Sequence, residues 1–191
     1  MRQSPVERLE SAELCGDRRT RLGVVADTHS QPHPAMLGQM TALAPDLILH
    51  AGDIGKPAVL DALCGIAPVF AVRGNTDPRR ADLADTVILE LRGADRHLRI
   101  LLTHIGLYGP KLRADVQKRA LARGASLVVC GHSHVPFIGR QGALTLFNPG
   151  SAGPRRFQLP IVFGIIDVTG EELRMAHVDC ETGRAWLPPG N

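Results

Sequence analysis

The sequence has few aromatic residues, no closely spaced cysteine pair and no long apolar run. Phe, Trp and Tyr make up 4% of its 191 residues, with one Trp and one Tyr. This scarcity argues against a nucleic-acid surface on which bases stack against aromatic rings. The four cysteines form no CxxC pair, so the sequence indicates neither a thiolate zinc site nor a redox dithiol.

Signals for a membrane or for secretion are also missing. No stretch reaches the ~20 apolar residues of a membrane-spanning helix, and the first twenty residues contain no apolar signal-peptide segment. We therefore expect a cytoplasmic protein with no membrane partner. Lys and Arg number 22 and Asp and Glu 19, a net charge of +3. So small an excess gives no support for nucleic acid as a partner.

Hydrophobic residues make up 44% of the chain, which is enough for a substantial core. The length fits one domain. Residues 1–20 are charged and only weakly periodic, and we expect them to form a flexible N-terminal tail. The remaining residues, 21–191, would then form a single domain.

The order of predicted elements changes along the chain. Apolar runs and helical spacing alternate in the first half, giving strands at 22–27, 46–53 and 68–75 and helices at 33–44 and 57–65. This alternation predicts a parallel sheet with crossover helices. The second half predicts hairpins at 85–104, 135–148 and 161–178, a helix at 111–124 and a strand at 126–134. We expect two mixed β-sheets packed together with helices outside, and an exposed apolar hairpin 161–178 would provide a homo-oligomer contact.

Side chains that commonly bind metals follow five of the predicted strands. They are two carboxylates, one amide and four imidazoles: Asp27, His29, Asp53, Asn75, His104, His132 and His134. In α/β sheets, sites form at the carboxyl ends of strands, so we expect these groups to meet. Oxygen and imidazole ligands suit Mn, Fe, Zn or Ni. Seven ligands exceed the needs of one tetrahedral ion but suit two ions that share a carboxylate.

Each of these motifs taken alone has an ordinary structural explanation. Asp27-x-His29 and Gly52-Asp53 are also common turn sequences, and His104 suits a hydrogen-bonded core position. The pair His132 and His134 is more specific, because two histidines after an apolar strand are costly to bury without a partner. Only the combination, in this order and at strand ends, predicts a metal site.

The ordered set D-x-H, GD, GN-x-D, TH and GH-x-H resembles the calcineurin-like metallophosphoesterase superfamily. It is most similar to the small single-domain bacterial and archaeal branch, which includes phosphodiesterases and shares its fold with a retromer scaffold subunit. The similarity runs from about Gly23 to Val178 and includes NPGS at 148–151. It implies a four-layer α/β/β/α sandwich and a dinuclear metal centre that hydrolyses a small phosphate ester.

The resemblance also assigns roles to single residues. It implies one metal held by Asp27, His29 and His134, a second held by Asn75, His104 and His132, and Asp53 bridging both. A hydroxide bridging the ions would attack phosphorus, with Asp53, Asn75 and His104 as the catalytic groups. We expect two divalent ions, with Mn2+ as the first choice and Ni2+, Fe2+ or Zn2+ as alternatives.

The substrate side departs from the family pattern. Many relatives have a histidine after the GN motif, but this chain has Thr76. A threonine hydroxyl is not a general acid near neutral pH, so the sequence identifies no acid for the leaving group. We predict Thr76, Arg155 and Arg156 as substrate-binding residues, although loop arginines are often merely exposed. The competing hypothesis is a non-catalytic protein-interaction scaffold of the same fold, which would bind metal without hydrolysing any ester.

Overall fold

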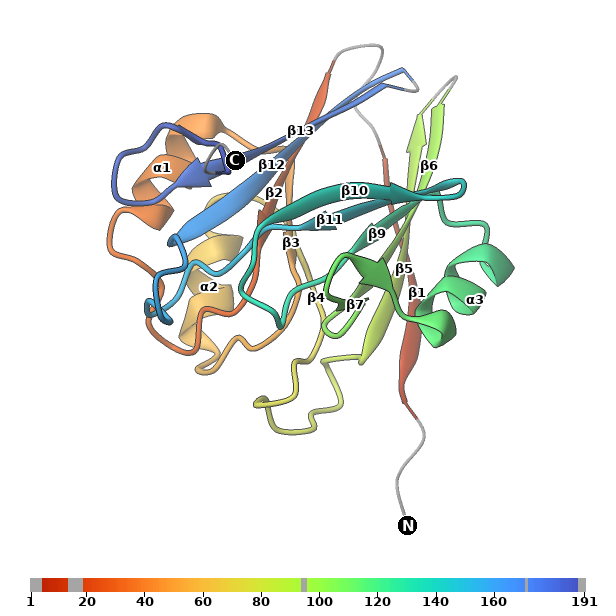
Figure 1. The fold of residues 1–191 in the computed structure, drawn as a ribbon, viewed down its shortest axis with the longest axis horizontal. Helices are drawn as coiled ribbons and strands as arrows, with labels where there is room; N and C mark the ends of the chain where they lie inside the picture. The colour runs from red at the N-terminus through yellow and green to blue at the C-terminus, as the bar shows by residue number, and fades with distance from the viewer. Residues whose placement is uncertain (1–4, 14–18, 94–95, 171, 189–191) are drawn as a thin grey trace.

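The computed structural model describes residues 5–13, 19–93, 96–170 and 172–188. Two six-stranded sheets form its centre (Figure 1). In spatial order, sheet A contains β1 (Glu7–Glu13), β5 (Thr86–Gly93), β6 (Arg96–Thr103), β9 (Leu127–Val129), β11 (Leu144–Asn148) and β10 (Phe137–Gln141). Sheet B contains β14 (Ala185–Trp186), β13 (Glu172–Asp179), β12 (Val162–Thr169), β2 (Thr20–Val25), β3 (Leu47–His50) and β4 (Val69–Ala71).

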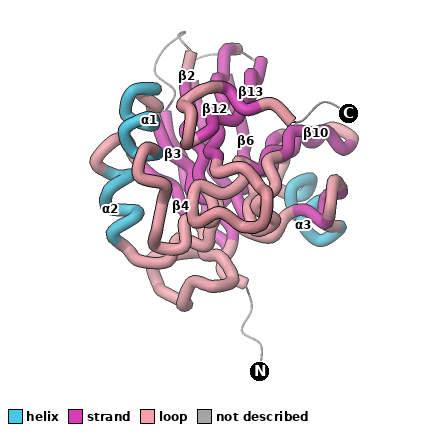
Figure 2. Tube along the Cα trace, turned by 60° about the vertical axis from the view of Figure 1, so that its left-hand side comes forward, coloured by secondary structure: helices cyan, strands magenta, loops and turns pink. Residues whose placement is uncertain are grey.

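The helices lie on the outside of the two sheets. Helices α1 (Met36–Leu43) and α2 (Ala58–Cys64) lie on one side of the strands, and α3 (Ala114–Ala122) lies on the opposite side (Figure 2). The expected four-layer α/β/β/α sandwich of two mixed sheets is therefore confirmed. No helix in the described part of the chain has the length and apolar character needed to cross a membrane.

Three clusters of buried apolar side chains fill the spaces between the four layers. The cluster between the sheets includes Leu22, Leu49, Leu89, Ile100 and Val129. The cluster between sheet B and its helices includes Val25, Met36, Met40, Ile48 and Leu63. The cluster between sheet A and α3 includes Ile88, Leu101, Val116, Ala120 and Val128. Neighbouring strand residues point to opposite faces, so continuous apolar runs such as β3 are buried on both sides.

The strand pairings follow the predicted connections. β2, β3 and β4 pair in parallel, and α1 and α2 are the crossovers between them. The three expected hairpins form antiparallel pairs, β5 with β6, β10 with β11 and β12 with β13. This arrangement brings the carboxyl ends of β2, β3 and β4 to one edge of sheet B.

Three sequence predictions were wrong in part. The expected tail is wrong for Glu7–Glu13, because this segment forms β1 and pairs in parallel with β5, while residues 1–4 and 14–18 lie outside the described residues. The helix expected at 111–124 begins at Ala114, because Lys111–Leu112 forms a short strand, β8, that pairs with β7 (Leu107–Tyr108).

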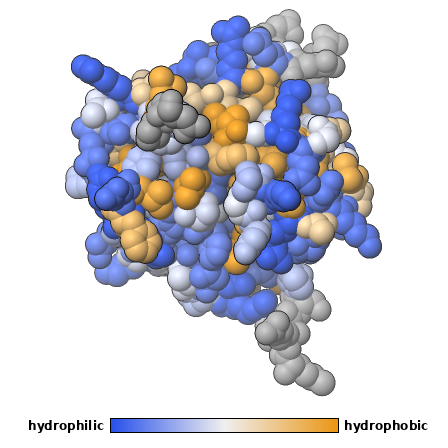
Figure 3. Space-filling model, viewed as in Figure 1, coloured by the Kyte–Doolittle hydropathy of each residue, from blue (hydrophilic) through white to orange (hydrophobic). Residues whose placement is uncertain are grey.

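The expectation of an exposed apolar hairpin at 161–178 is also wrong for its β12 half, while a homo-oligomer stays a prediction. β12 is an inner strand of sheet B, and most of its side chains are buried. Its apolar residues therefore belong to the core of the protein. On the face drawn in Figure 3, hydrophobic side chains form separate patches between hydrophilic ones.

Candidate metal centre

The loops that carry the seven predicted ligands follow the carboxyl ends of β2, β3, β4, β6 and β9. Backbone hydrogen bonds join these loops directly. The Asp27 and His29 amides donate to the carbonyls of Gly52 and Asp53, each at 2.9 Å. The Gly131 amide donates to the His104 carbonyl at 3.0 Å. Segments from both sheets thus meet at one place, as the strand-end pattern predicts.

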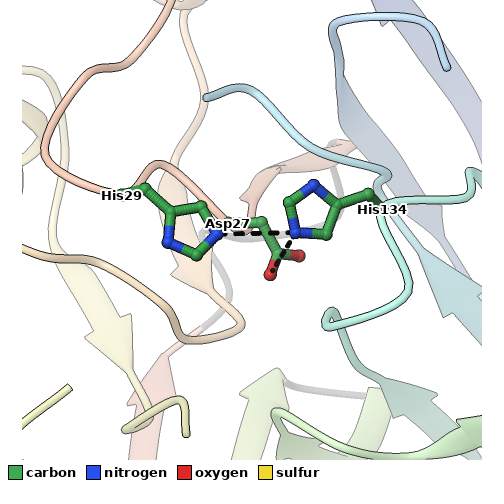
Figure 4. Close-up of side chains that lie close together, drawn as sticks. All are labelled: Asp27, His29 and His134. Atoms are coloured by element: carbon green, nitrogen blue, oxygen red, sulfur yellow. Dashed lines mark hydrogen bonds and ion pairs between the residues drawn. The ribbon is translucent and has the colours of Figure 1, made fainter. Parts of the chain in front are cut away.

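The first group of potential ligands contains Asp27, His29 and His134, whose ligand atoms lie within 4.8 Å of one another. The two imidazoles point toward each other beside the Asp27 carboxylate (Figure 4). His134 Nε2 is 3.3 Å from Asp27 Oδ1 and 3.4 Å from His29 Nε2. Burial is the main cause that lowers the pKa of His29, and a neutral imidazole is the form that binds a metal.

The second group contains Asp27, Asp53 and His104, again with ligand atoms within 4.8 Å. His104 Nδ1 donates to the Ala51 carbonyl at 2.8 Å, which leaves the lone pair on Nε2. Nε2 lies 3.0 Å from Asn75 Oδ1. A carbonyl on one ring nitrogen and free ligand capacity on the other is the usual arrangement of a metal-binding histidine.

Asp53 lies between the two histidines of these groups. Its Oδ2 is 3.8 Å from His29 Nε2, and its Oδ1 is 3.4 Å from His104 Nε2. The Thr76 amide also donates to Oδ1 at 2.9 Å. Burial alone would raise the pKa of Asp53, but the contacts with His104 and Thr76 lower it well below its usual range. Asp53 is therefore ionised at neutral pH, as a shared ligand must be.

His132 is less closely engaged than the other predicted ligands. It is exposed and belongs to neither group of three among the described residues. Its amide donates to Asp27 Oδ2 at 2.9 Å, and its ring packs edge-on against His104 with centroids 5.1 Å apart. The side chain therefore borders the centre on the His104 side.

Five of the seven predicted ligands have a left-handed backbone. Positive φ angles occur at Asp27 (55°), His29 (45°), Asp53 (53°), His132 (71°) and His134 (59°). This conformation is uncommon for residues other than glycine and is costly unless the surrounding structure enforces it. Because five left-handed residues occur together here, we infer that the loop conformations are held in place so that these side chains point into the centre.

Two glycines permit the close approach of the loops. A Cβ at Gly74 would lie 2.0 Å from Asp53 Oδ1 and 2.1 Å from the Asp53 amide nitrogen. A Cβ at Gly131 would lie 2.9 Å from Asp27 Oδ2. Both glycines of the GN and GH motifs are therefore needed because a carboxylate of the centre occupies the space beside them.

The buried residue Asp77 holds two loops of the centre together. The Asp77 carboxylate accepts from the amides of Ile54, Gly55 and Gly74 at 2.8–3.1 Å. It therefore joins the loop after β3 to the loop after β4, a role that the GN-x-D spacing alone does not indicate.

The loop containing NPGS supports the centre from the other side. Asn148 donates to the Gly131 carbonyl at 2.9 Å and to Ser133 Oγ at 3.1 Å. The Ser151 hydroxyl donates to the Asp27 carbonyl at 3.0 Å. In the sequence this motif is only a feature shared with the family, and the structure shows that it fixes the two loops carrying Asp27 and the GHSH histidines.

The three predicted substrate-binding residues are placed differently. Thr76 is exposed beside Asp53, and Arg156 Nη2 lies 3.2 Å from His29 Nε2. Arg155 instead pairs with Glu181 and donates to the Leu159 carbonyl at 2.9 Å. The structure therefore brings Thr76 and Arg156 to the centre and directs the Arg155 guanidinium elsewhere.

The distribution of unsatisfied polar atoms tests whether a metal ion fits. Three buried side-chain atoms of the described residues have no hydrogen-bond partner, and two of them are Asp27 Oδ1 and His134 Nδ1. Buried polar atoms are normally hydrogen-bonded, so the lack of a donor at Asp27 Oδ1, which belongs to the first ligand group, indicates a ligand that the protein chain does not supply. Carboxylate, amide and imidazole groups form a donor set that fits divalent transition metals.

The fold is that of a calcineurin-like phosphoesterase, and the chain belongs to that superfamily. Residues 20–171 match the calcineurin-like phosphoesterase superfamily domain. A probable metallophosphoesterase of Methanothermobacter thermautotrophicus is 31% identical over 171 residues, covering 87% of this chain and 94% of the relative. Phosphodiesterase YfcE of Escherichia coli is 29% identical over 108 residues, about half of each chain.

Solved structures show the same fold. Vps29 of Entamoeba histolytica superposes with a TM-score of 0.71 at 20% identity, covering 87% of this chain and 96% of that structure. The E. coli phosphoesterase YfcE superposes with a TM-score of 0.61 at 20% identity, covering 88% of this chain and 97% of that structure. One Entamoeba histolytica Vps29 structure contains Zn2+.

Proposed function

We propose that this protein is a metal-dependent phosphodiesterase with a dinuclear centre. The observation that carries the proposal is the pair of ligand groups joined through Asp27, with Asp53 facing a histidine of each group. Two cations a few ångströms apart need shared anionic ligands between them.

Each predicted ligand has a place in this proposal. Asp27, His29 and His134 would hold one ion, Asn75, His104 and His132 the other, and Asp53 both. The donor set does not choose between metals, and Mn2+ is our first choice, with Ni2+, Fe2+ and Zn2+ as alternatives.

The cations, when bound, supply a water acidic enough to act as nucleophile and positive charge for the phosphoryl oxygens. The chain contributes orientation and charge. His104 Nε2 is directed toward Asp53 and Asn75 by its bond to the Ala51 carbonyl. Arg156, close to His29, is placed to donate to a phosphate oxygen from outside the ligand set.

The position after the GN motif favours esters with good leaving groups. Thr76 lies beside Asp53 and has no group that donates a proton to an alkoxide near neutral pH. The relative YfcE is named a phosphodiesterase, which supports diesters as the substrate class. An activated diester, whose leaving group needs no acid, is therefore the appropriate first substrate.

The alternative is a scaffold that binds metal but hydrolyses nothing. The fold similarity to Vps29 favours this alternative, whereas the presence of all seven predicted ligands on loops that meet at one place favours an enzyme. The test compares metal-free and Mn2+-reconstituted protein on bis-p-nitrophenyl phosphate and p-nitrophenyl phosphate. We expect hydrolysis that requires metal and is faster for the diester; bound metal without turnover of any ester would favour the scaffold.

A further inference from the structure

A cavity adjoins the candidate metal centre on the side of α3. Its volume is about 270 Å³. Asn75 and His104, which face each other at 3.0 Å in the centre, also line this cavity. A molecule held at the centre therefore has open space beside it in this direction.

Arginine is the most frequent residue in the wall of this cavity. The arginines come from the loops after β4, the segment before α3 and α3 itself: Arg73, Arg79, Arg113 and Arg119. The carboxylates in the wall are Asp85 and Asp115, so arginines outnumber them by two. Glu7, outside the wall, approaches Arg119 at 3.8 Å. The cavity thus has a positive charge that its own residues do not neutralise.

The arginines differ in how far their donors are already used. Arg73 is tightly paired with Asp85, with Nη2 2.6 Å from Oδ1. Arg79 lies farther from the same carboxylate, with Nη1 3.7 Å from Oδ2, and it donates no hydrogen bond to any described residue. Arg113 bonds Asp115 through Nε at 3.2 Å, which leaves its terminal nitrogens available. Arg79 and Arg113 therefore offer the planar donors that phosphate groups accept.

The start of α3 adds further donors to this wall. Asp115 and Val116, in its first turn, both line the cavity. The first amides of a helix have no acceptor within the helix and favour an anion. No side chain caps this end, and the Asp115 carboxylate is 63% exposed. The described lining residues include no Phe, Tyr or Trp, so the cavity suits a charged group better than a nucleobase.

We propose that this space, the arginine cavity, binds a second phosphate group of the substrate. The substrate class is then a phosphodiester with a phosphomonoester on one arm. This inference rests on the proposed function, because the diester must lie at the metal centre. Water adds across one P–O bond of the diester, giving a phosphomonoester and an alcohol, while the second phosphate stays intact and positions the substrate.

The test compares two esters that differ in one phosphate. They are the p-nitrophenyl ester of deoxythymidine 5′-phosphate and the same ester with a 3′-phosphate. We expect the reconstituted protein to prefer the second by about 100-fold in kcat/KM. Arg79→Gln and Arg113→Gln should each reduce this preference about tenfold, equivalent to about 1.4 kcal/mol. The matched control is Arg184→Gln, an exposed arginine outside the cavity, which should retain the full preference.

Equal kcat/KM for the two esters, or a preference unchanged by Arg79→Gln and Arg113→Gln, would overturn the arginine cavity. Calorimetric binding of deoxythymidine 3′,5′-bisphosphate and 5′-monophosphate tests the same inference without turnover. We expect tighter binding of the bisphosphate, lost in Arg113→Gln, and equal affinities would refute it. If neither ester nor bis-p-nitrophenyl phosphate is hydrolysed, the proposed function fails, and the binding comparison alone decides the cavity.

Discussion

Asp53 and His104 face each other across the two sheets, with Oδ1 of the carboxylate 3.4 Å from Nε2 of the imidazole. Each is held in this direction by a backbone group. The Thr76 amide donates to Asp53 Oδ1, and His104 Nδ1 donates to the Ala51 carbonyl. The pair is therefore oriented by the protein backbone, which is the condition for a fixed metal centre.

Asp53→Asn should remove activity without unfolding the protein. The amide keeps the shape of the side chain but supplies no negative charge to share between two ions. We expect kcat on bis-p-nitrophenyl phosphate to fall at least about 100-fold, with unfolding free energy changed by no more than about 1 kcal/mol. His132→Ala should behave in the same direction, because this exposed side chain supports little of the core.

The matched control for Asp53→Asn is Asp61→Asn. Asp61 is an exposed residue of α2 away from the centre, so turnover and metal content should stay at the wild-type level. Enzyme kinetics, metal analysis and urea unfolding of both variants check this. If Asp53→Asn unfolded the chain while any folded fraction kept full activity, the side chain would be structural.

Gly74→Ala should disturb the centre through a single methyl group. The new Cβ would lie 2.0 Å from Asp53 Oδ1 and 2.1 Å from its backbone nitrogen, so the backbone must move. We expect a loss of about 1–3 kcal/mol in unfolding free energy and about 10- to 100-fold weaker Mn2+ binding. Calorimetric titration with Mn2+ measures the second effect.

Gly38→Ala is the corresponding control for added volume. Gly38 lies inside α1, and a Cβ there meets no atom within 4 Å beyond the backbone of its own helix and its chain neighbours. Because alanine is the better helix former, we expect a gain of about 0.5–1 kcal/mol and unchanged metal affinity. Equal metal affinities for the two variants would show that the close approach of Gly74 to Asp53 is not needed for metal binding.

Asp167→Asn should reveal a pH-dependent contribution to folding stability, made by a side chain outside the metal centre. Asp167 on β12 accepts two hydrogen bonds from Arg21 on β2, at 2.7 and 2.9 Å. These bonds lower the pKa of Asp167 below its usual 3.8. Its stabilisation is therefore complete above pH 3.8 and is lost as pH falls through the lower, folded-state value. We expect the variant to lose about 1–3 kcal/mol at pH 7.

Urea unfolding between pH 7 and pH 3 measures this difference. The difference in unfolding free energy between wild type and Asp167→Asn should stay constant from pH 7 to pH 5 and become smaller below about pH 4. Glu172→Gln removes an exposed partner of Arg174 and should change stability by less than about 0.5 kcal/mol throughout. A gap that widened in acid would contradict the assigned pKa direction.

Chelation should abolish activity if the centre works through bound cations. We expect EDTA to stop hydrolysis of bis-p-nitrophenyl phosphate and added Mn2+ to restore it. Asp27 Oδ1 supplies the physical reason, because this buried atom has no hydrogen-bond partner and a bound cation would satisfy it. Full activity in the presence of excess chelator would contradict this mechanism.

The strands that lead to the centre could be predicted because their sequence signal is local. An apolar run buried on both faces, followed at once by Asp27 or Asp53, indicates both a parallel strand and a polar edge. β1 could not be predicted in this way. Its sequence, ERLESAE, offers only Leu9 and Ala12 as apolar residues, and its order comes from pairing with β5.

Features that depend on distant segments were outside the reach of the sequence. Asp77 resembles a turn residue until its three amide donors are seen. The arginine cavity joins Arg79 and Arg113 from separate loops, with no motif to connect them. The apolar exposure expected of hairpin 161–178 was wrong for its β12 half, because apolar character alone does not distinguish an inner strand from an exposed one.

Stepwise loading of metal-free protein with Mn2+ tests the central claim most directly. Metal content per chain and hydrolysis of bis-p-nitrophenyl phosphate should be measured on the same samples. We predict that each chain binds two ions and that turnover appears only as the second is bound. Binding of a single ion at saturation, or of two ions with no ester hydrolysed, would contradict the dinuclear phosphodiesterase.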